Sequence, residues 1–327
     1  MRSAVYRRYG PPSGLTLQEL PEPTPERGEV LVRVHATSIN AGDLHMLRGR
    51  PLVVRPYAGG LLKPTIGVLG SDVAGVVEAV GDDVEAFRLG DRVMGDLSES
   101  GFGGFAELAV APPNVLANIP VGVSFREAAA LPSAGTTALQ GLRDHGELSS
   151  GQHVLVNGAS GGVGSFAVQI AKSMGAEVTG VCSARKMDLV RNLGADHVVD
   201  YGREDFTTHE GRYDLILDTA AYRPIWVMRR PLRPRGRYIA VGGAFGRTML
   251  AIALGPLLSS KSGRTLRFMG VKKPSGEDLA HLAALTDQGS LTPAVDRTFP
   301  LECVVEAMEH LEREHGQGKI ILSVAPV

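Results

Sequence analysis

The sequence has little cysteine, few aromatic residues and no dominant charge. Its 327 residues include only two cysteines, Cys182 and Cys303, which are too few for a disulfide scaffold or a thiolate zinc cluster. The 34 basic and 35 acidic residues give a formal net charge of −1, so no overall basic field attracts nucleic acid or an anionic membrane. We therefore expect neither of these as a partner.

Long apolar segments are missing as well. The apolar stretch at residues 249–258 is too short to cross a bilayer. No apolar run follows the arginines of the first ten residues, as it would in a secretory signal. We therefore expect a cytoplasmic protein. Residues 249–258 fit the mouth of a substrate site, ordinary core or a dimer surface equally well.

Two different patterns of secondary structure follow each other along the chain. Short β-rich runs separated by glycine, proline and aspartate turns predict a mostly antiparallel, barrel-like unit, with strands at residues 3–7, 29–39, 74–80, 92–95 and 107–110. From about residue 124, strands alternate with helices, which predicts a parallel sheet between helices. Its strands are expected at residues 154–156, 177–181, 197–199, 215–217, 238–241 and 265–271, with helices at 162–174 and 185–193. In the tail we expect helices at 276–288 and 301–310 and a strand at 319–324.

A glycine-rich turn joins the strand at residues 154–156 to the helix that begins at Gly162. The turn contains Gly158, Gly161, Gly162 and Gly164, although the first position of the usual G-x-G-x-x-G motif is Ala159. Small residues let the backbone approach a pyrophosphate, and a helix N-terminus offers it unpaired N–H groups. This context predicts a dinucleotide-binding site.

The end of the next strand indicates which dinucleotide is bound. An NAD site usually has an acidic residue there, which binds the ribose hydroxyls. Here the strand ends in Cys182-Ser183-Ala184-Arg185-Lys186, where a hydroxyl and two cations suit a 2′-phosphate. We therefore predict NADP(H). The alternative is that Arg185 and Lys186 are the solvated start of the next helix, although cations in a first turn oppose the helix dipole.

Several separated motifs resemble the medium-chain dehydrogenase/reductase superfamily, and within it the zinc-free quinone oxidoreductase branch, including mitochondrial reductases of the reticulon-interacting type. They lie upstream and downstream of the glycine-rich turn and cover nearly the whole chain, at residues 67–81, 90–93, 104–107, 128–132, 135–138, 194–201, 215–218 and 241–243.

The resemblance implies an α/β protein with two domains and an active site between them. A GroES-like, mostly antiparallel catalytic domain would comprise residues 1–124 and 272–327, and a Rossmann NADP-binding domain with a doubly wound parallel sheet would comprise residues 125–271. The resemblance also implies cofactor contacts: Ser160, Gly161, Gly162 and Val163 at the pyrophosphate; Ser183 and Lys186 at the 2′-phosphate; Tyr201 at the adenine or ribose; and Gly242, Gly243 and Thr136 or Thr137 near the nicotinamide. Arg185 joins the 2′-phosphate candidates from its own position after the strand.

Two motif positions argue against a catalytic zinc. Zinc-dependent members of the superfamily carry a Cys-x-x-Asp-x-His stretch and a Gly-His-Glu stretch. Here Asn40 replaces the cysteine and Ser71 replaces the histidine, so too few ligands remain. Without zinc, hydride transfer to a quinone or an α,β-unsaturated carbonyl is easier than reduction of a simple ketone, because the acceptor is already conjugated. We predict no metal.

The catalytic candidates follow from the same stretch. We expect Asn40 to contact the substrate oxygen, with Asp43 and His45 beside it and Tyr57 in a flap formed by residues 51–64. Each has a structural alternative: a turn for Asn40, a helix cap for Asp43 and a surface position for His45. Tyr201 has one too, as a packed aromatic residue.

Three functions compete on this sequence. The leading hypothesis is an NADPH-dependent reductase of a small-molecule quinone or enone. The alternatives are a zinc-type alcohol dehydrogenase and a non-catalytic NADPH-binding or sensor protein. The resemblance also suggests a homodimer, with residues 265–271 as an edge strand that pairs across a two-fold axis.

Overall fold

The chain folds into two units. A computed structural model describes all residues except 66, 244–254, 256–258, 260–262, 315 and 325–327. Unit 1 comprises Met1–Thr136, Pro274–Gly289 and Pro293–Val327, and unit 2 comprises Thr137–Lys273 and Ser290–Thr292. The functional domain boundaries expected above, after residue 124 and before residue 272, remain a proposal. Apart from Gly255, the apolar stretch at residues 249–258 lies outside the described residues.

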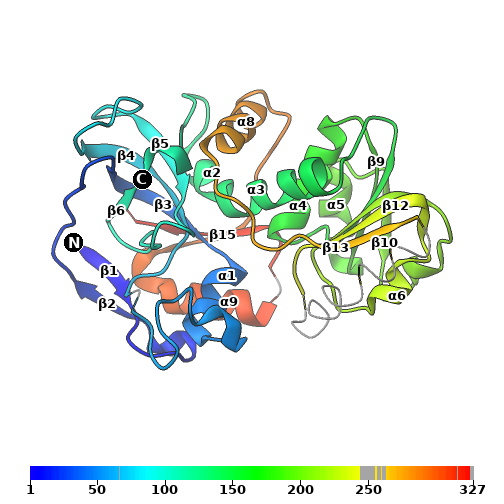
Figure 1. The fold of residues 1–327 in the computed structure, drawn as a ribbon, viewed down its shortest axis with the longest axis horizontal. Coiled ribbons are helices and arrows are strands. Elements are labelled where there is room, and N and C mark those ends of the chain that lie inside the picture. Colours follow the sequence, from blue (N-terminus) through cyan, green and yellow to red (C-terminus); the bar gives the residue numbers. More distant parts are fainter. Residues whose placement is uncertain (66, 244–254, 256–258, 260–262, 315, 325–327) are drawn as a thin grey trace. The chain divides into compact units, whose positions relative to one another are not determined.

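Unit 1 is built around a seven-stranded sheet of order β14-β15-β3-β4-β5-β7, with β6 also paired to β3. Only the β14–β15 pairing is parallel. The red strand β15 lies beside the blue strand β3, so the two ends of the chain meet in one sheet (Figure 1). The strands are β3 (Val30–Ile39), β4 (Asp72–Val80), β5 (Arg92–Asp96), β6 (Leu108–Ala111), β7 (Leu116–Asn118), β14 (Val295–Pro300) and β15 (Lys319–Ser323), and a separate hairpin pairs β1 (Arg2–Val5) with β2 (Thr16–Glu19).

Helices complete unit 1. They are α1 (Ala41–Arg48), α2 (Phe125–Ala130), α8 (Gly276–Asp287) and α9 (Val304–Glu314), with short 3-10 turns at Pro12–Gly14, Leu52–Val54, Pro113–Val115 and Leu301–Cys303. Helix α3 (Pro132–Gln140) runs across the boundary between the units. The core consists of the alternate, inward-facing residues of the strands, among them Val30, Val32 and Val34 of β3, which are almost completely buried.

Unit 2 is an all-parallel sheet of order β10-β9-β8-β11-β12-β13. Its central strands read as continuous apolar runs because both faces are covered, and Val154, Leu155 and Val156 are fully buried. The strands are β8 (His153–Asn157), β9 (Glu177–Cys182), β10 (His197–Asp200), β11 (Tyr213–Asp218), β12 (Leu232–Ala240) and β13 (Thr265–Phe268); the helices are α4 (Gly162–Ser173), α5 (Met187–Asn192) and α6 (Ile225–Met228), a π-helix at Gly141–His145 and 3-10 turns at Ala184–Lys186 and Phe206–Thr208.

The parallel sheet of unit 2 and the mostly antiparallel sheet of unit 1 confirm the predicted fold class. Three strands were not predicted. Strand β2 is mostly exposed, β7 has three residues, and β14 buries only Phe299, so none of them shows a clear alternation. Among the described residues, no helix has the length and apolar character that crossing a bilayer requires.

Candidate active site

Asn40, Asp72 and Lys319 lie together because of the order of the strands in unit 1. Asn40 follows the end of β3, Asp72 begins β4, and Lys319 begins β15. Both β4 and β15 run antiparallel to β3 and flank it. The end of β3 therefore lies between the beginnings of its two neighbours, and the three polar side chains meet there.

The ammonium group of Lys319 is the centre of this cluster. Its Nζ donates to Asn40 Oδ1 and to Asp72 Oδ2, the latter at 3.3 Å, and its side chain is only 3 % exposed. An ammonium group only donates, so the amide oxygen of Asn40 must face it. The amide nitrogen then donates to Asp72 Oδ2 at 2.9 Å and to Ser71 Oγ at 3.2 Å. The orientation of Asn40 is thus fixed by Lys319.

The carboxylate of Asp72 is fully buried and fully hydrogen-bonded. Besides Asn40 and Lys319, Oδ2 accepts from the hydroxyl of Ser38, and Oδ1 accepts from the backbone N–H of Ser133 at 2.9 Å. Ser133 lies in the first turn of α3, where the helix dipole favours an anion. The Lys319–Asp72 pair is thus a buried ion pair whose carboxylate accepts several further hydrogen bonds.

Asp43 holds the backbone of Asn40 in place. Its Oδ2 accepts from the backbone N–H of Asn40 at 2.8 Å, which fixes the start of helix α1 in the manner of a capping box. Burial raises the pKa of Asp43 to about 7, against the opposing effect of the hydrogen bond from Asn40; the nearby carboxylate of Asp72 adds to the rise. Both the capping interpretation and a place beside the candidate site therefore hold for Asp43.

Because the pKa of Asp43 is raised, we expect the replacement of this carboxyl to change how the free energy of unfolding depends on pH. Between about pH 4 and about pH 7 the folded protein holds the Asp43 proton that the unfolded chain releases, so the free energy of unfolding falls as pH rises through this window. In Asp43→Asn the free energy of unfolding should fall less steeply with pH. The Asp43 proton contributes on the order of 1 kcal/mol for each pH unit in this window. Urea unfolding at several pH values measures it.

The matched control for that measurement is Asp188→Asn, because the Asp188 side chain is 93 % exposed. This control should leave the slope unchanged. An Asp43→Asn variant with the same pH dependence as the parent protein would contradict the assignment of a buried, protonated carboxyl.

His45 and Tyr57 do not contact the Asn40 cluster. His45 is exposed in the last turn of α1, and its Nδ1 donates to the carbonyl oxygen of Arg50 at 3.1 Å. Tyr57 lies three residues beyond the turn at Leu52–Val54 and is 67 % exposed. The structure therefore brings Asn40 and Asp43 together and leaves the other two catalytic candidates on the surface.

The two positions that distinguish zinc-dependent sequences, Asn40 and Ser71, are in direct contact. Among the described residues, no group of three or more histidine, cysteine, aspartate or glutamate side chains has an arrangement that could hold a metal ion. The cation that balances Asp72 belongs to the chain itself, because it is the ammonium of Lys319.

In unit 2 the glycine-rich turn forms a narrow cradle at the end of β8. Gly158 has φ of +81°, which favours glycine. A Cβ atom on Gly164 would lie 2.1 Å from the carbonyl oxygen of Gly158, so α4 approaches the turn as closely as only glycine permits. The N–H groups of Gly162, Val163 and Gly164 begin α4 and have no partner within the helix. Together with the buried Ser160, this geometry fits a pyrophosphate.

The buried carboxyl of Asp218 joins its own strand to the two neighbouring strands, one of which leads into the glycine-rich turn. Asp218 ends β11 and accepts from Asn157 Nδ2 at 2.7 Å, from Tyr238 Oη at 2.9 Å and from the N–H of Ala220 at 3.1 Å. Burial raises the pKa of Asp218 to about 6, although the hydrogen bonds from Asn157 and Tyr238 oppose this rise. The ends of β8, β11 and β12 are thereby tied together beneath the turn.

The residues that the sequence predicts to bind the adenosine and its 2′-phosphate lie just after the ends of β9 and β10. Ser183 follows β9 directly, and its carbonyl oxygen accepts from the N–H of Lys186 at 2.9 Å. Lys186 is only 7 % exposed, whereas Arg185 is exposed. Tyr201 follows β10, is 57 % exposed, and donates its backbone N–H to the carbonyl of Cys182 at 3.2 Å. The exposed ring of Tyr201 does not support the alternative of a packed core aromatic.

The remaining cofactor candidates fall at two places. Thr136 is fully buried on α3, and its hydroxyl has no hydrogen-bond partner among the described residues. Thr137 is the next residue on that helix. Gly242 accepts from the N–H of Ala221 at 2.9 Å, and a Cβ atom on Gly243 would lie 2.4 Å from the same nitrogen.

Sequence reasoning missed three important members of these clusters: Lys319, Asp218 and Tyr238. A signal for Lys319 was present, because a single lysine precedes the apolar run Ile320, Ile321 and Leu322, where a buried cation requires a partner. The partner lies 247 residues away along the chain and could not be read from spacing.

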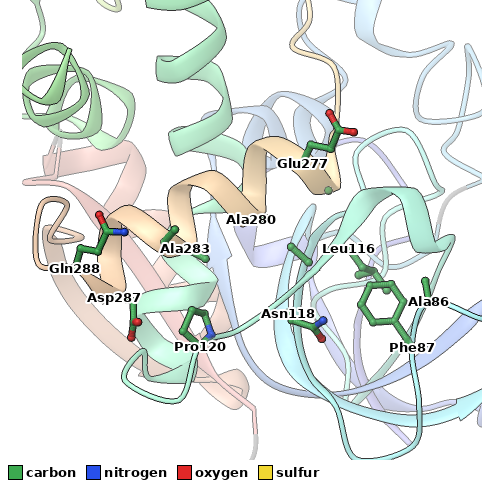
Figure 2. Close-up of a pocket in the computed structure, with 13 residues that line it drawn as sticks. Ala86, Phe87, Leu116, Asn118, Pro120, Glu277, Ala280, Ala283, Asp287 and Gln288 are labelled. Atoms are coloured by element: carbon green, nitrogen blue, oxygen red, sulfur yellow. The ribbon is translucent and has the colours of Figure 1, made fainter.

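One pocket lies apart from all predicted site residues. It is formed within unit 1 between helix α8 and strand β7 (Figure 2). Alanines of α8 line one part of it, and Phe87, Leu116 and Asn118 line another. None of the candidate residues described above contributes to it.

Comparison with known proteins identifies the family. Residues 26–121 match the alcohol dehydrogenase GroES-like domain, and residues 193–322 match a family described as zinc-binding dehydrogenase. The chain is 36 % identical to a chloroplastic quinone-oxidoreductase, QR1, of Triphysaria versicolor, over 98 % of both chains. It is 33 % identical to the mitochondrial NAD(P)H oxidoreductase RTN4IP1 of Mus musculus, over 90 % of this chain and 82 % of that one. The solved quinone oxidoreductase of Coxiella burnetii superimposes with a TM-score of 0.89 at 30 % identity, over 99 % of both chains.

These matches show an oxidoreductase with a nicotinamide cofactor. The chain belongs to the medium-chain dehydrogenase/reductase superfamily, as the resemblance implied. Its similarity to quinone oxidoreductases confirms the predicted branch. The names of these relatives place them in chloroplasts and mitochondria, so the cytoplasmic location stays a prediction.

Proposed function

We propose that the protein transfers a hydride from NADPH to a quinone or an α,β-unsaturated carbonyl compound without zinc. The observation that carries the proposal is the Lys319 ammonium between Asn40 and Asp72. A divalent cation bound by the same oxygens would have to displace the buried ammonium of Lys319 or be repelled by it. The names of the similar proteins support a quinone as acceptor.

Within this proposal, Asn40 provides the hydrogen bond to the substrate oxygen. Lys319 withdraws electron density from the amide oxygen and makes the amide N–H groups stronger donors. Of the two bonds that Asn40 Nδ2 makes, the one to Ser71 at 3.2 Å is longer than the one to Asp72 at 2.9 Å. A substrate oxygen would take the place of Ser71 and accept from a polarised amide as negative charge develops. His45 and Tyr57, both exposed, stay candidates for proton delivery.

The nicotinamide supplies the hydride, and the chain's residues hold the cofactor. The cradle at Gly158 and Gly164 would bind the pyrophosphate, and Ser183, Arg185 and Lys186 would bind the 2′-phosphate that distinguishes NADPH from NADH. None of the four residues that directly follow β9, at positions 183–186, is acidic.

The variant Lys186→Met tests this cofactor preference. Methionine preserves the buried stem and removes the charge-assisted hydrogen bond, which is worth about 1.5–3 kcal/mol. We expect kcat/KM for NADPH to fall by about tenfold or more, with little change for NADH. Arg230→Met, which removes an exposed cation elsewhere in unit 2, is the control. Equal losses for both cofactors would contradict a contact with the 2′-phosphate.

The function itself is tested with metal-analysed protein, by following oxidation of NADPH or NADH with a naphthoquinone and with a simple enone. Faster oxidation of NADPH that is insensitive to a chelator is the expected result. Stoichiometric zinc, or loss of activity with chelator, would instead favour the zinc-type alcohol dehydrogenase. Tight NADPH binding without turnover of any acceptor would favour a sensor protein.

We also propose a homodimer that pairs through strand β13. Among the described strands, β13 ends the sheet of unit 2, so one of its edges has no described partner. Sedimentation velocity decides this point, because a monomer at micromolar concentration would exclude the dimer.

A further inference from the structure

A loop at residues 49–63 of unit 1, here named the 49–63 loop, exposes an unusual number of large apolar side chains. Leu62 is 94 % exposed, and four other residues of the loop are more than half exposed: Leu52, Val53, Tyr57 and Leu61. Single exposed apolar residues are ordinary, but a group within one loop marks an interaction surface.

The loop is held in place by its own contacts. Tyr9 donates its hydroxyl to the carbonyl of Gly60 at 2.5 Å. Arg55 donates to the carbonyls of Gly49 at 3.1 Å and Leu61 at 2.8 Å, and its guanidinium lies over the ring of Tyr9. Ala58 is completely buried beneath the loop. The apolar side chains are thus displayed by an ordered segment, so less conformational entropy is lost when a partner binds.

The two chain segments that meet at the loop carry cations, although carboxylates of other segments, Glu107, Glu302 and Glu312, pair with two of them. Residues 1–18 and 44–71 contain no aspartate or glutamate, and the contact between Tyr9 and Gly60 brings the two segments together. They contain seven lysine and arginine residues: Arg2, Arg7, Arg8, Arg48, Arg50, Arg55 and Lys63. Two of these, Arg2 and Arg48, are paired with carboxylates. Within the part of the chain that the structure describes, the other five form no ion pair with a carboxylate.

From these observations we propose that the 49–63 loop docks on the surface of a bilayer that contains anionic phospholipids. The aliphatic side chains of Leu52, Val53, Leu61 and Leu62 enter the boundary between headgroups and acyl chains, and the cations contact the lipid phosphates. The loop combines exposed apolar side chains with cations and contains no aspartate or glutamate, a combination that an anionic bilayer surface attracts. The net charge of −1 led to the opposite expectation because it averages over the whole chain.

Vesicle sedimentation tests the proposal on the full chain. We expect the protein to bind vesicles of phosphatidylcholine with about a third of phosphatidylglycerol, to bind pure phosphatidylcholine much more weakly, and to be released by salt. Lys63→Gln should weaken binding about fivefold, since each cation near the surface contributes on the order of 1 kcal/mol. Leu62→Ser should weaken it by roughly tenfold through lost apolar burial.

The matched controls are Arg126→Gln, an exposed cation on α2, and Val121→Ser, where the side chain is 95 % exposed outside the loop. Both should bind like the parent protein. NADPH binding, which the proposal assigns to unit 2, should be unchanged in all four variants, and this separates lipid binding from cofactor binding. No binding to anionic vesicles, equal binding to neutral ones, or equal losses in the controls would overturn the proposal.

Discussion

Lys319→Met is expected to cost about 3–5 kcal/mol of unfolding free energy and most of the reductase activity. Its ammonium is the cation that faces the completely buried carboxylate of Asp72 and orients the amide of Asn40. Methionine fills much of the same volume but leaves Asp72 charged and without a counter-ion. It also leaves Asn40 Oδ1 without its donor, so the amide loses the orientation on which a hydrogen bond to substrate depends.

A second substitution separates charge from packing. In Lys319→Met/Asp72→Asn no uncompensated charge remains, so the double variant should be more stable than the single one, although its activity stays low. Lys319→Arg retains the cation and should recover part of the stability. Lys63→Gln, which changes an exposed lysine of the same unit, is the control. If Lys319→Met unfolds like Lys63→Gln, the buried salt bridge is not a main support of unit 1.

The single tryptophan makes it possible to follow the unfolding of unit 2 separately in this urea experiment. Trp226 lies on α6 in unit 2, so its fluorescence reports the unfolding of unit 2, whereas circular dichroism reports both units. Lys319→Met should therefore shift the urea transition seen by circular dichroism more than the one seen by fluorescence.

Gly164→Ala is expected to weaken NADPH binding at least tenfold and to destabilise unit 2 by about 1–3 kcal/mol. The added Cβ atom would lie 2.1 Å from the carbonyl oxygen of Gly158 and 2.8 Å from Ala159 Cα, both of which are backbone atoms. Helix α4 or the turn must move, and the N–H groups to which we assign the pyrophosphate move with it. The Trp226 transition in urea and a titration with NADPH measure the two effects.

Gly161→Ala is the matched control in the same turn. Gly161 has φ of −85°, which any residue adopts, and its Cβ atom would meet only the carbonyl of Gly158 at 3.4 Å. This variant should keep the stability of unit 2, even if it weakens cofactor binding by a direct contact. If Gly164→Ala were as stable as Gly161→Ala and bound NADPH normally, the close approach of α4 would have no role in the cradle.

The glycine-rich turn could be predicted because its signal is local. Strand β8, the four glycines and helix α4 follow each other within about two dozen residues, and each position has its own backbone requirement. The continuous apolar strands of unit 2 were predicted for the same reason. Strand β14 was missed because it lies at the edge of its sheet and buries only Phe299, so its sequence does not alternate.

The polar clusters could not be predicted because they depend on which strands become neighbours. Nothing near Asp72 in the sequence indicates that β15 will bring Lys319 to it, and nothing near Asp218 indicates Asn157 or Tyr238. The motif comparison identified Asn40 as the position of interest. It did not show that both N–H groups and the oxygen of that amide are already engaged within the protein.

The insertion of β15 between β14 and β3 also sets an order of events on the ribosome. Most of unit 2 is one continuous stretch, Thr137–Lys273, so it is able to form its sheet while the rest of the chain is still being made. Strand β3 emerges early but receives β15 only after residue 319 has been synthesised. Until then the nascent chain carries an open strand edge and an uncompensated Asp72, and this is the interval in which a chaperone would be needed most.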